Sequence, residues 1–327
     1  MKAVVIPHVR GAWTVSQVAI PEPKHDEVLI KLHASGICYS DVHLTQGSLP
    51  GKFPQILGHE PAGEIVAVGA AVTSRTVGDR VGLAWNQRSC GRCEWCLGGR
   101  PRFCLHGIST GIEVAGSHAE YMSAPADATM LIPDALSYEQ AAPIFCAGYT
   151  VWGGLQYADP KPHERVAVVG IGGLGHLAVQ YAKAAGFETI AVTHSPDKRA
   201  LATQLGADAV VESGAELAAL GGADIILGTG NSHQAMVDAI AGLRPEGRLV
   251  WMGVAEDPFV VPARLFEQRG RIVASGQNGA QYLYEALDLA ARGKVRVMEE
   301  CFPIDQAAEA YERVATGKAL FRAVLVM

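Results

Sequence analysis

The sequence predicts a two-domain α/β protein, with one β-rich domain and one domain built on a doubly wound parallel sheet. Three observations support this prediction. Roughly the first 135 residues contain short apolar stretches broken by glycine and proline. From Arg165 onward, apolar strands alternate with helical segments of about a dozen residues. A glycine-rich loop, from Gly170 to Gly175, lies directly between a strand and a helix.

Composition limits the classes of protein to consider. At 327 residues, 49% hydrophobic and 18% charged, the chain is long enough for one large or two ordinary globular domains. It has no apolar run that could span a bilayer and no signal-peptide core before Pro7, so we expect a cytoplasmic protein without a membrane partner. A net charge of -6 and a pI of about 6.0 argue against nucleic acid as a partner.

The β-rich part is expected to come first. Its candidate strands each follow or precede a turn signal, and they span residues 2–6, 27–34, 62–68, 78–84 and 117–124. The pattern changes at Ser137, which with Gln140 predicts a capping box at the start of an alanine-rich helix. Pro143 is expected to break this helix and to leave Cys146 at the start of the next one.

The second part alternates strands and helices, as is typical of a parallel sheet covered on both faces. The expected strands span residues 165–170, 189–194, 207–211, 223–228 and 247–253. The expected helices span residues 173–186, 195–206 and 233–243, with Ser195 as the N-cap of the second one. Beyond these elements we expect helices at 280–292 and 305–316 and a final strand at 321–327.

The glycine loop is expected to bind a dinucleotide. Glycines at this place allow a tight turn, a close approach of the backbone to a pyrophosphate, and close packing of the helix that follows. Its position after a strand and before a helix makes the motif informative, although a tight turn without a ligand is the alternative. The predicted contacts are Gly170, Gly172, Gly173, Leu174 and Gly175.

The end of the second strand favours NADP(H) over NAD(H). An acid about 20 residues after the loop would bind the ribose of NAD, but Thr193 stands there, followed by His194 and Ser195. Hydroxyls at a helix start and the cations Lys198 and Arg199 suit a 2'-phosphate better than an acid would. The alternative is that these two cations form a solvated helix face, offset by Asp197.

The stretch from Gly36 to Glu60 is a candidate reactive site, because it gathers a thiol, imidazoles, hydroxyls and acids in an apparently irregular segment. Cys38 and His59 are ligand types that zinc prefers, and Asp41 and Glu60 could hold them in place through hydrogen bonds. The alternative is a buried free thiol with a surface histidine. This stretch by itself does not decide between the two.

A second candidate metal site comprises four cysteines in one short segment, Cys90, Cys93, Cys96 and Cys104. Four thiolates can close a tetrahedral zinc site that leaves no position for substrate, so its role would be structural. A zinc ribbon that binds nucleic acid and an iron–sulfur cluster are the alternatives. The second is considered because three of the cysteines follow a CxxCxxC pattern.

The motifs GICYSD, GHE, CGRCEWC, CAGYTVW and GIGGLG, in this order, resemble the zinc-dependent alcohol dehydrogenases of the medium-chain dehydrogenase/reductase superfamily. The resemblance covers nearly the whole chain. It implies a GroES-like β domain that carries the catalytic zinc, a Rossmann domain, and a cleft between them. We expect the GroES-like domain to comprise residues 1–140 and 277–327, and the Rossmann domain to comprise residues 141–276.

The resemblance also implies roles for individual residues. Cys38, His59 and Cys146 match the catalytic zinc ligands, with Glu60 as the nearby acid of the same group, and the four clustered cysteines match the structural zinc ligands. Further matches are Ser40 for the hydroxyl that bonds the substrate oxygen, His43 for the base at the end of a proton relay through the cofactor ribose, Thr150 for a nicotinamide contact, and Arg322 for a basic residue near the pyrophosphate.

Several positions depart from the family pattern or are variable within it. Tyr39 stands where many members have histidine or arginine beside the pyrophosphate. Trp85 and Leu49 stand where yeast-like members have aromatic pocket residues, and Leu49 indicates either a roomier pocket or ordinary core packing. Thr193 and the residues after it resemble the NADP-using cinnamyl-alcohol branch. Cys301 is left over, because the two zinc sites use six of the seven cysteines.

We therefore expect an enzyme with two zinc ions per chain that transfers hydride between NADP(H) and a primary alcohol or aldehyde. The family suggests a homodimer or homotetramer. Two alternatives stay open at this point. One is a zinc-free quinone or enoyl reductase of the same superfamily, and the other is a non-catalytic NADPH-binding protein.

Overall fold

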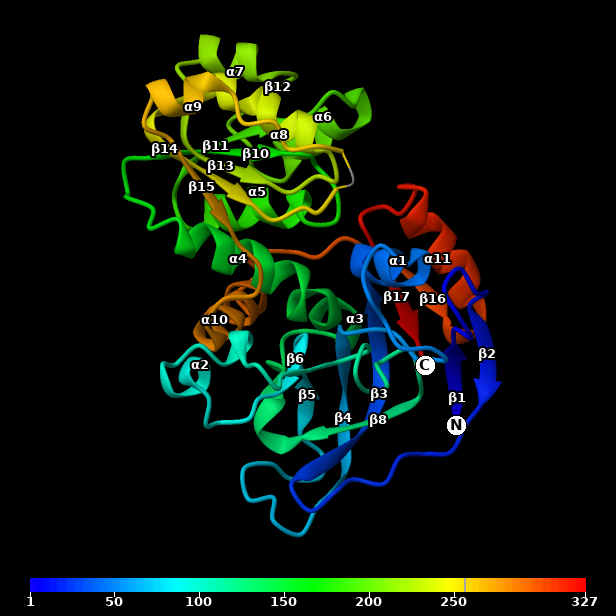
Figure 1. The fold of residues 1–327 in the computed structure, drawn as a ribbon. Helices are drawn as coiled ribbons and strands as arrows, with labels where there is room; N and C mark the ends of the chain where they lie inside the picture. Colours follow the sequence, from blue (N-terminus) through cyan, green and yellow to red (C-terminus); the bar gives the residue numbers. More distant parts are fainter. Residues whose placement is uncertain (256) are drawn as a thin grey trace. The chain divides into compact units, whose positions relative to one another are not determined.

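The computed structural model describes residues 1–255 and 257–327, which form two compact units (Figure 1). The first unit contains Met1–Cys146 and Val297–Met327, and the second contains Ala147–Arg296. The predicted return to the first domain at residue 277 is therefore too early, because helix α10 (Ala280–Ala291) packs against α4 (Ala147–Tyr157) in the second unit. Within that packing Trp152 Nε1 donates to Glu285 Oε2 at 2.6 Å.

The first unit is built on one large sheet and two small hairpin-like pairs. The large sheet has the order β16, β17, β3, β4, β5, β9, and β8 also pairs with β3. All its pairings are antiparallel except β16 with β17. The strands of this unit are β1 (Lys2–Val5), β2 (Thr14–Gln17), β3 (Glu27–Ile37), β4 (Pro61–Val68), β5 (Arg80–Gly82), β6 (Asn86–Arg88), β7 (Ile108–Ser109), β8 (Tyr121–Pro125), β9 (Met130–Leu131), β16 (Glu299–Pro303) and β17 (Arg322–Val326).

The candidate reactive stretch contains a helix that the sequence interpretation missed. Strand β3 runs on to Ile37, and α1 (Tyr39–Gln46) begins directly after Cys38. The Cys38 backbone N–H donates to Asp41 Oδ2 at 2.8 Å, which satisfies a donor at the helix start. Gly47 ends the helix with φ of 84°, a conformation that glycine adopts without strain. The other helices of this unit are α2 (Glu94–Leu97), α3 (Tyr138–Ala141) and α11 (Ala307–Ala315).

The predicted change of pattern at Ser137 is confirmed. Its side chain accepts from the Gln140 backbone N–H, and the Gln140 side chain accepts from the Ser137 N–H, so both halves of the capping box are present. Pro143 lies in a short 3-10 helix, Ala142–Phe145, that follows α3. Cys146 ends this turn, immediately before α4 begins.

The second unit has the predicted doubly wound sheet. Its order is β12, β11, β10, β13, β14, β15, and every pairing is parallel. The strands are β10 (Arg165–Val169), β11 (Glu188–Val192), β12 (Ala209–Val211), β13 (Ala223–Gly228), β14 (Leu243–Trp251) and β15 (Arg271–Ala274). The sequence interpretation missed β15, whose four residues are only half-buried or exposed at the sheet edge.

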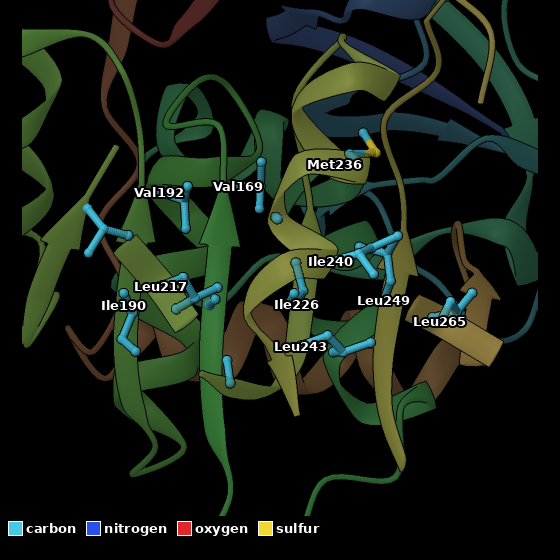
Figure 2. Packing of buried hydrophobic residues seen from close by; sticks show 14 residues of the cluster. Val169, Ile190, Val192, Leu217, Ile226, Met236, Ile240, Leu243, Leu249 and Leu265 are labelled. Atoms are coloured by element: carbon cyan, nitrogen blue, oxygen red, sulfur yellow. The ribbon is translucent and has the colours of Figure 1, made fainter. Parts of the chain in front are cut away.

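Helices cover this sheet, and apolar side chains between them form the core. The helices not yet named are α5 (Gly175–Ala184), α6 (Pro196–Gln204), α7 (Gly214–Ala219), α8 (His233–Ala239) and α9 (Ala263–Glu267). Figure 2 shows Ile190 and Val192 of β11 near Leu217 of α7, and Met236 of α8 farther along the same apolar cluster. Within the described residues, no helix is both long and apolar enough to cross a bilayer.

Candidate functional site

Four potential metal ligands from separate segments of the first unit meet in one cluster. Cys38 precedes α1, His59 and Glu60 precede β4, and Cys146 ends the 3-10 turn after α3. One ligand atom from each lies within 4.8 Å of the others. The two thiol sulfurs are 3.8 Å apart, close to the separation of about 3.8 Å that two tetrahedral Zn–S bonds impose. The described geometry therefore suits a metal ion.

The two ring nitrogens of His59 have different surroundings: one faces a carboxylate, and the other has no hydrogen-bond partner among the described residues. Nδ1 lies 3.7 Å from Asp41 Oδ1, whereas the buried Nε2 has no hydrogen-bond partner within the described part of the chain. Burial lowers the pKa of His59, but the Asp41 carboxylate and the Cys38 thiolate outweigh burial and raise it to about 9. A buried, unpaired ring nitrogen beside two thiols is what a zinc ligand requires.

The two thiols of the cluster have pKa values that are shifted in opposite directions. A hydrogen bond with Cys146, together with the nearby His59, holds the pKa of Cys38 well below its ordinary value, although burial opposes this effect. The same hydrogen bond and burial raise the pKa of Cys146 well above its ordinary value. One thiolate and one thiol are thus favoured in the metal-free protein, and a dication that binds both would release a proton.

Glu60 is held away from solvent by a buried ion pair with Arg322, whose Nη2 donates to Glu60 Oε1. The same guanidinium nitrogen donates to the Ile37 carbonyl at 3.3 Å. Burial raises the pKa of Glu60 to about 7, while Arg322 acts in the opposite direction. A Cβ atom at Gly36 would overlap the Glu60 carboxylate, so this arrangement requires glycine there.

Sheet order explains why Glu60 and Arg322 meet. Strand β3 lies between β17 and β4, with Gly36 opposite Val324 on one side and Ser35 opposite Pro61 on the other. Both charged residues therefore reach the same end of β3. The sequence interpretation missed this pair and the need for Gly36, and it assigned Arg322 only to the cofactor pyrophosphate, a role that stays a prediction.

The four clustered cysteines also come together. Their sulfurs lie within 4.8 Å of one another, with Cys93 Sγ at 3.5 Å and Cys90 Sγ at 4.0 Å from Cys96 Sγ. Backbone hydrogen bonds lower the pKa of Cys93 to about 6, whereas burial raises that of Cys96 to about 11. The backbone N–H groups of Cys90 and His106 donate to Cys104 Sγ at 3.2 and 3.4 Å and fix its position in the cluster.

The two predicted proton-transfer residues lie on α1. Ser40 Oγ is 3.6 Å from Cys38 Sγ, so its hydroxyl reaches the edge of the metal cluster. His43 is buried, and its Nδ1 lies 3.1 Å from Ser48 Oγ. Tyr39 packs edge-on against the His43 ring. The roles of Ser40 and His43 stay predictions, as does that of Thr150, which is buried on α4 of the second unit.

Trp85 and Leu49, the two positions compared with pocket residues, both lie in the first unit. The Trp85 ring packs edge-on against His59, with ring centroids 4.7 Å apart. Leu49 is partly buried against an apolar cluster of that unit, which agrees with ordinary core packing. Trp85 therefore belongs to the wall of the metal cluster, and Leu49 belongs to the apolar packing of the first unit.

The glycine loop has the geometry expected for a phosphate cradle. Gly170 has φ of 85°, and a Cβ at Gly175 would overlap the Gly170 carbonyl, so the loop and α5 can pack closely only with glycine. A Cβ at Gly172 would meet no atom within 4 Å. The loop is therefore open at Gly172, where the backbone would approach a pyrophosphate, and Gly173 and Leu174 follow at the start of α5.

The residues expected to bind the 2'-phosphate are only partly available. Thr193 is buried and its Oγ1 accepts from the Ser195 N–H at 3.4 Å, while His194 is exposed. Ser195 is the N-cap of α6. Arg199 is paired with Glu212, so a phosphate would have to compete with this carboxylate for the guanidinium.

Comparisons with known proteins agree with this geometry. Residues 24–134 match the alcohol dehydrogenase GroES-like domain, and residues 173–292 match the zinc-binding dehydrogenase family. An alcohol dehydrogenase from Geobacillus stearothermophilus is 40% identical over 99% of both chains. The chain belongs to the zinc-binding alcohol dehydrogenases.

Solved structures support the same assignment for the dehydrogenase. A cinnamyl alcohol dehydrogenase from Sorghum bicolor superposes with a TM-score of 0.92 at 29% identity, over 99% of this chain and 97% of that one. An enzyme described as an NAD-dependent alcohol dehydrogenase gives a TM-score of 0.93 at 28% identity, over 100% of both chains. The predicted family and fold class are confirmed, and the dehydrogenase is a zinc-dependent oxidoreductase that uses a nicotinamide cofactor.

This membership decides between the alternatives that the sequence left open. A zinc-binding dehydrogenase is favoured over a zinc-free reductase, and an oxidoreductase is favoured over a non-catalytic NADPH-binding protein. Which metal the four-cysteine cluster holds stays a prediction.

Zinc binding at the cluster of Cys38, His59 and Cys146 is expected to weaken as the pH falls from about 9 to about 6. The pKa of His59 is raised from 6.5 to about 9, so the metal-free side chain carries a proton throughout this window. Zinc must displace that proton, and each displaced proton lowers the apparent affinity about 10-fold per pH unit. Chelator competition at several pH values measures the slope.

The matched control is His59→Asn, in which the remaining zinc reports on the four-cysteine cluster. Its release should have the pH dependence of that cluster's own thiols, such as Cys96, whose pKa is raised to about 11. Subtracting this curve from that of the parent enzyme isolates the cluster that contains His59, and a pH-independent affinity there between about pH 6 and 9 would contradict the role of His59 as a ligand that must lose a proton.

Proposed function

We propose that the dehydrogenase transfers hydride between NADP(H) and a primary alcohol or aldehyde, with two zinc ions per chain. The observation that carries this proposal is the cluster of two thiols and one unpaired, buried imidazole nitrogen. Three protein ligands leave a fourth position for substrate, as in other catalytic zinc sites. The four-cysteine cluster would hold the second zinc in a closed, structural site.

Different residues of the first unit have separate proposed roles in metal binding and proton transfer. Cys38, His59 and Cys146 would hold the zinc, which supplies a Lewis acid for the substrate oxygen, while the nicotinamide supplies or accepts the hydride. Glu60 stays engaged by Arg322, so it does not occupy the fourth position. The Ser40 hydroxyl lies at the edge of the cluster and can exchange a proton with the substrate oxygen.

His43 is the candidate base for the proton that Ser40 receives. It lies on the same helix, and its ring is fixed between Ser48 and Tyr39. A buried imidazole held in this way can pass a proton outward without leaving a charge stranded at the reaction centre. Thr150 and the glycine loop would hold the nicotinamide and pyrophosphate ends of the cofactor, with Arg322 as a further candidate contact.

The preference for NADP(H) rests on the absence of an acid at Thr193 and on the cations that follow. Lys198 and Arg199 lie on the first turns of α6, close to where the 2'-phosphate would bind. Glu212 competes for Arg199, and this makes the preference moderate instead of strict. Oxidation of NADPH and of NADH across aliphatic, allylic and aromatic aldehydes tests both the cofactor and the substrate class.

Thr193→Asp is expected to reverse the preference, lowering kcat/KM for NADPH about 10- to 100-fold while NADH is retained or improved. The introduced carboxylate would repel the 2'-phosphate and could accept from the ribose hydroxyls of NADH. Thr193→Val is the matched control, because it keeps the size of the side chain and adds no charge. An unchanged ratio of the two kcat/KM values for Thr193→Asp would contradict the proposed cofactor position.

We also place the protein in the cytoplasm as a homodimer or homotetramer. The family resemblance suggests this assembly, and the free edge strand β15 of the second unit offers a surface for pairing. The segment before β15 exposes three apolar side chains, Val260, Val261 and Phe266. Their burial against a second copy of the chain would favour an interface at this edge of the sheet.

A further inference from the structure

The buried carboxylate of Asp41 is surrounded on four sides by nitrogen atoms. Oδ1 accepts from the Gly58 N–H at 3.2 Å and lies 3.7 Å from His59 Nδ1. Oδ2 accepts from the Cys38 N–H at 2.8 Å and lies 3.8 Å from His118 Nε2. A carboxylate has about four lone-pair sites, so each oxygen has one backbone N–H and one imidazole available to it.

His118 is the member of this set that the metal cluster does not explain. Its side chain is 0% exposed, as is that of Asp41, and its Nε2, 3.8 Å from Asp41 Oδ2, has no hydrogen-bond partner within the described residues. Its other nitrogen, Nδ1, lies 2.9 Å from Ser35 Oγ, which in turn lies 2.7 Å from Ser117 Oγ. The sequence interpretation placed His118 inside a candidate strand and assigned it no role.

The His118 ring is fixed against the segment that carries His59. A Cβ at Gly58 would lie 2.6 Å from His118 Nδ1, so the imidazole packs directly against that glycine. The His118 N–H donates to the Leu57 carbonyl at 3.0 Å, and Trp13 packs on the ring with centroids 5.1 Å apart. The imidazole cannot tilt away from Asp41 without disturbing the loop before His59.

The hydrogen-bond partners also select the tautomer of His118. An Nε2 lone pair would face the Asp41 carboxylate, which is itself only an acceptor, and two buried acceptors would then oppose each other. The Ser35 hydroxyl can donate to Nδ1 and leave the ring proton on Nε2. The favoured arrangement is therefore a Ser35 hydroxyl that donates to Nδ1 and an Nε2–H that faces the Asp41 carboxylate from 3.8 Å, an electrostatic contact longer than a hydrogen bond.

We propose that His118 is a positioning residue for the metal cluster. By occupying Asp41 Oδ2 it orients the carboxylate so that Oδ1 holds the Nδ1–H tautomer of His59 and leaves His59 Nε2 to bind the metal. This inference rests on the proposed role of His59 as a zinc ligand. The contacts run from Ser35 through His118 to Asp41 and end at the ring of His59.

The test compares two substitutions that keep different nitrogen positions of the imidazole. His118→Gln can place an amide N–H near the former Nε2 and so rescue the contact with Asp41. His118→Asn can replace only the group near Nδ1. In the zinc-loaded enzyme, His118→Asn is expected to release zinc to a chelator about 10- to 100-fold faster from the cluster that contains His59, and His118→Gln is expected to remain within about 3-fold of the parent.

A spectroscopic readout separates positioning from a merely structural role. With cobalt(II) in place of zinc, the visible absorption bands of the cluster should shift in His118→Asn and be restored in His118→Gln, because they report the geometry of the ligands. Unchanged zinc release and unchanged bands in His118→Asn would overturn the proposal, as would equal effects of the two substitutions. Should His118→Asn fail to fold, Ser35→Ala, which removes only the hydroxyl behind the ring, must show the same direction of change.

The failure of this inference can be told apart from failure of the proposed function. His59→Asn should remove one metal ion per chain if His59 is a ligand, whatever the role of His118. If His59→Asn leaves the metal content and the cobalt spectrum unchanged, the proposed metal site is wrong. If His59→Asn removes the ion and His118→Asn has no effect, only the positioning role is wrong.

Discussion

Cys38→Ala is expected to lower the rate of alcohol oxidation at least about 1000-fold and to reduce the zinc content from two ions per chain to one. A metal that stabilises charge on the reacting oxygen contributes several kcal/mol to the barrier, and about 1.4 kcal/mol corresponds to a factor of 10. The fold should survive, because Asp41 caps α1 through the Cys38 backbone N–H, which alanine retains. Metal analysis and steady-state kinetics on the same preparation measure both effects.

Cys301→Ala is the matched control for this substitution. Cys301 is an exposed thiol on β16 and belongs to neither cluster, so its replacement should leave two zinc ions and near-parent turnover. Retention of most activity in Cys38→Ala would contradict the proposed catalytic site. If activity is lost while both zinc ions are still bound, Cys38 is not a zinc ligand and contributes to activity in another way.

Arg322→Met is expected to destabilise the first unit by roughly 3–5 kcal/mol, because removal of one partner leaves the Glu60 charge buried without compensation. Glu60 is 0% exposed, and Arg322 is the cation paired with it. The double variant Glu60→Gln with Arg322→Met should recover most of this loss, since neither member of the pair is then left as an unpaired buried charge. Urea unfolding of the zinc-loaded proteins measures the differences in midpoint.

The pH dependence of this effect has a defined sign. The pKa of Glu60 is already raised from 4.5 to about 7, and loss of Arg322 removes an influence that lowers it. A carboxyl whose pKa is higher in the folded state loses stability as pH rises from 4.5 through the folded value. The destabilisation by Arg322→Met should therefore be largest above about pH 7 and small near the unfolded pKa.

Arg313→Met provides a matched control for the buried pair. Arg313 and Glu300 form a comparable ion pair at 2.7 Å, but their side chains are 37% and 25% exposed. Water screens such a pair, so its loss should cost about 1 kcal/mol or less. Similar costs for the Arg322 and Arg313 variants would show that burial does not control the strength of the Glu60 pair.

Features that depend on neighbouring residues could be predicted from the sequence. The alternation of apolar strands with helices after Arg165 indicated the doubly wound sheet, because the period of the pattern shows which faces are buried. The spacing of Cys90, Cys93, Cys96 and Cys104 indicated a metal cluster, because ligands in one short segment need no distant part of the chain to meet. The capping box at Ser137 was equally local.

Features that depend on contacts between distant segments could not be predicted from local pattern. Only family resemblance joined Cys146 to Cys38 and His59, which are far from it in the sequence. Helix α10 was assigned to the wrong unit because the contact that holds it, Trp152 with Glu285, spans 133 residues. The helix α1 was missed because its capping signal, Cys38 with Asp41, is not a usual capping pair.

The sequence by itself determined the two-domain α/β architecture, the dinucleotide loop and the two sets of candidate metal ligands. Only the tertiary structure decided which residues support those ligands. Arg322 reaches Glu60, 262 residues away, because β17 and β4 flank the same end of β3, and Gly36 leaves room for the carboxylate. His118 reaches Asp41 through the pairing of its loop with Leu57. Such contacts follow from strand order and register, which no local pattern encodes.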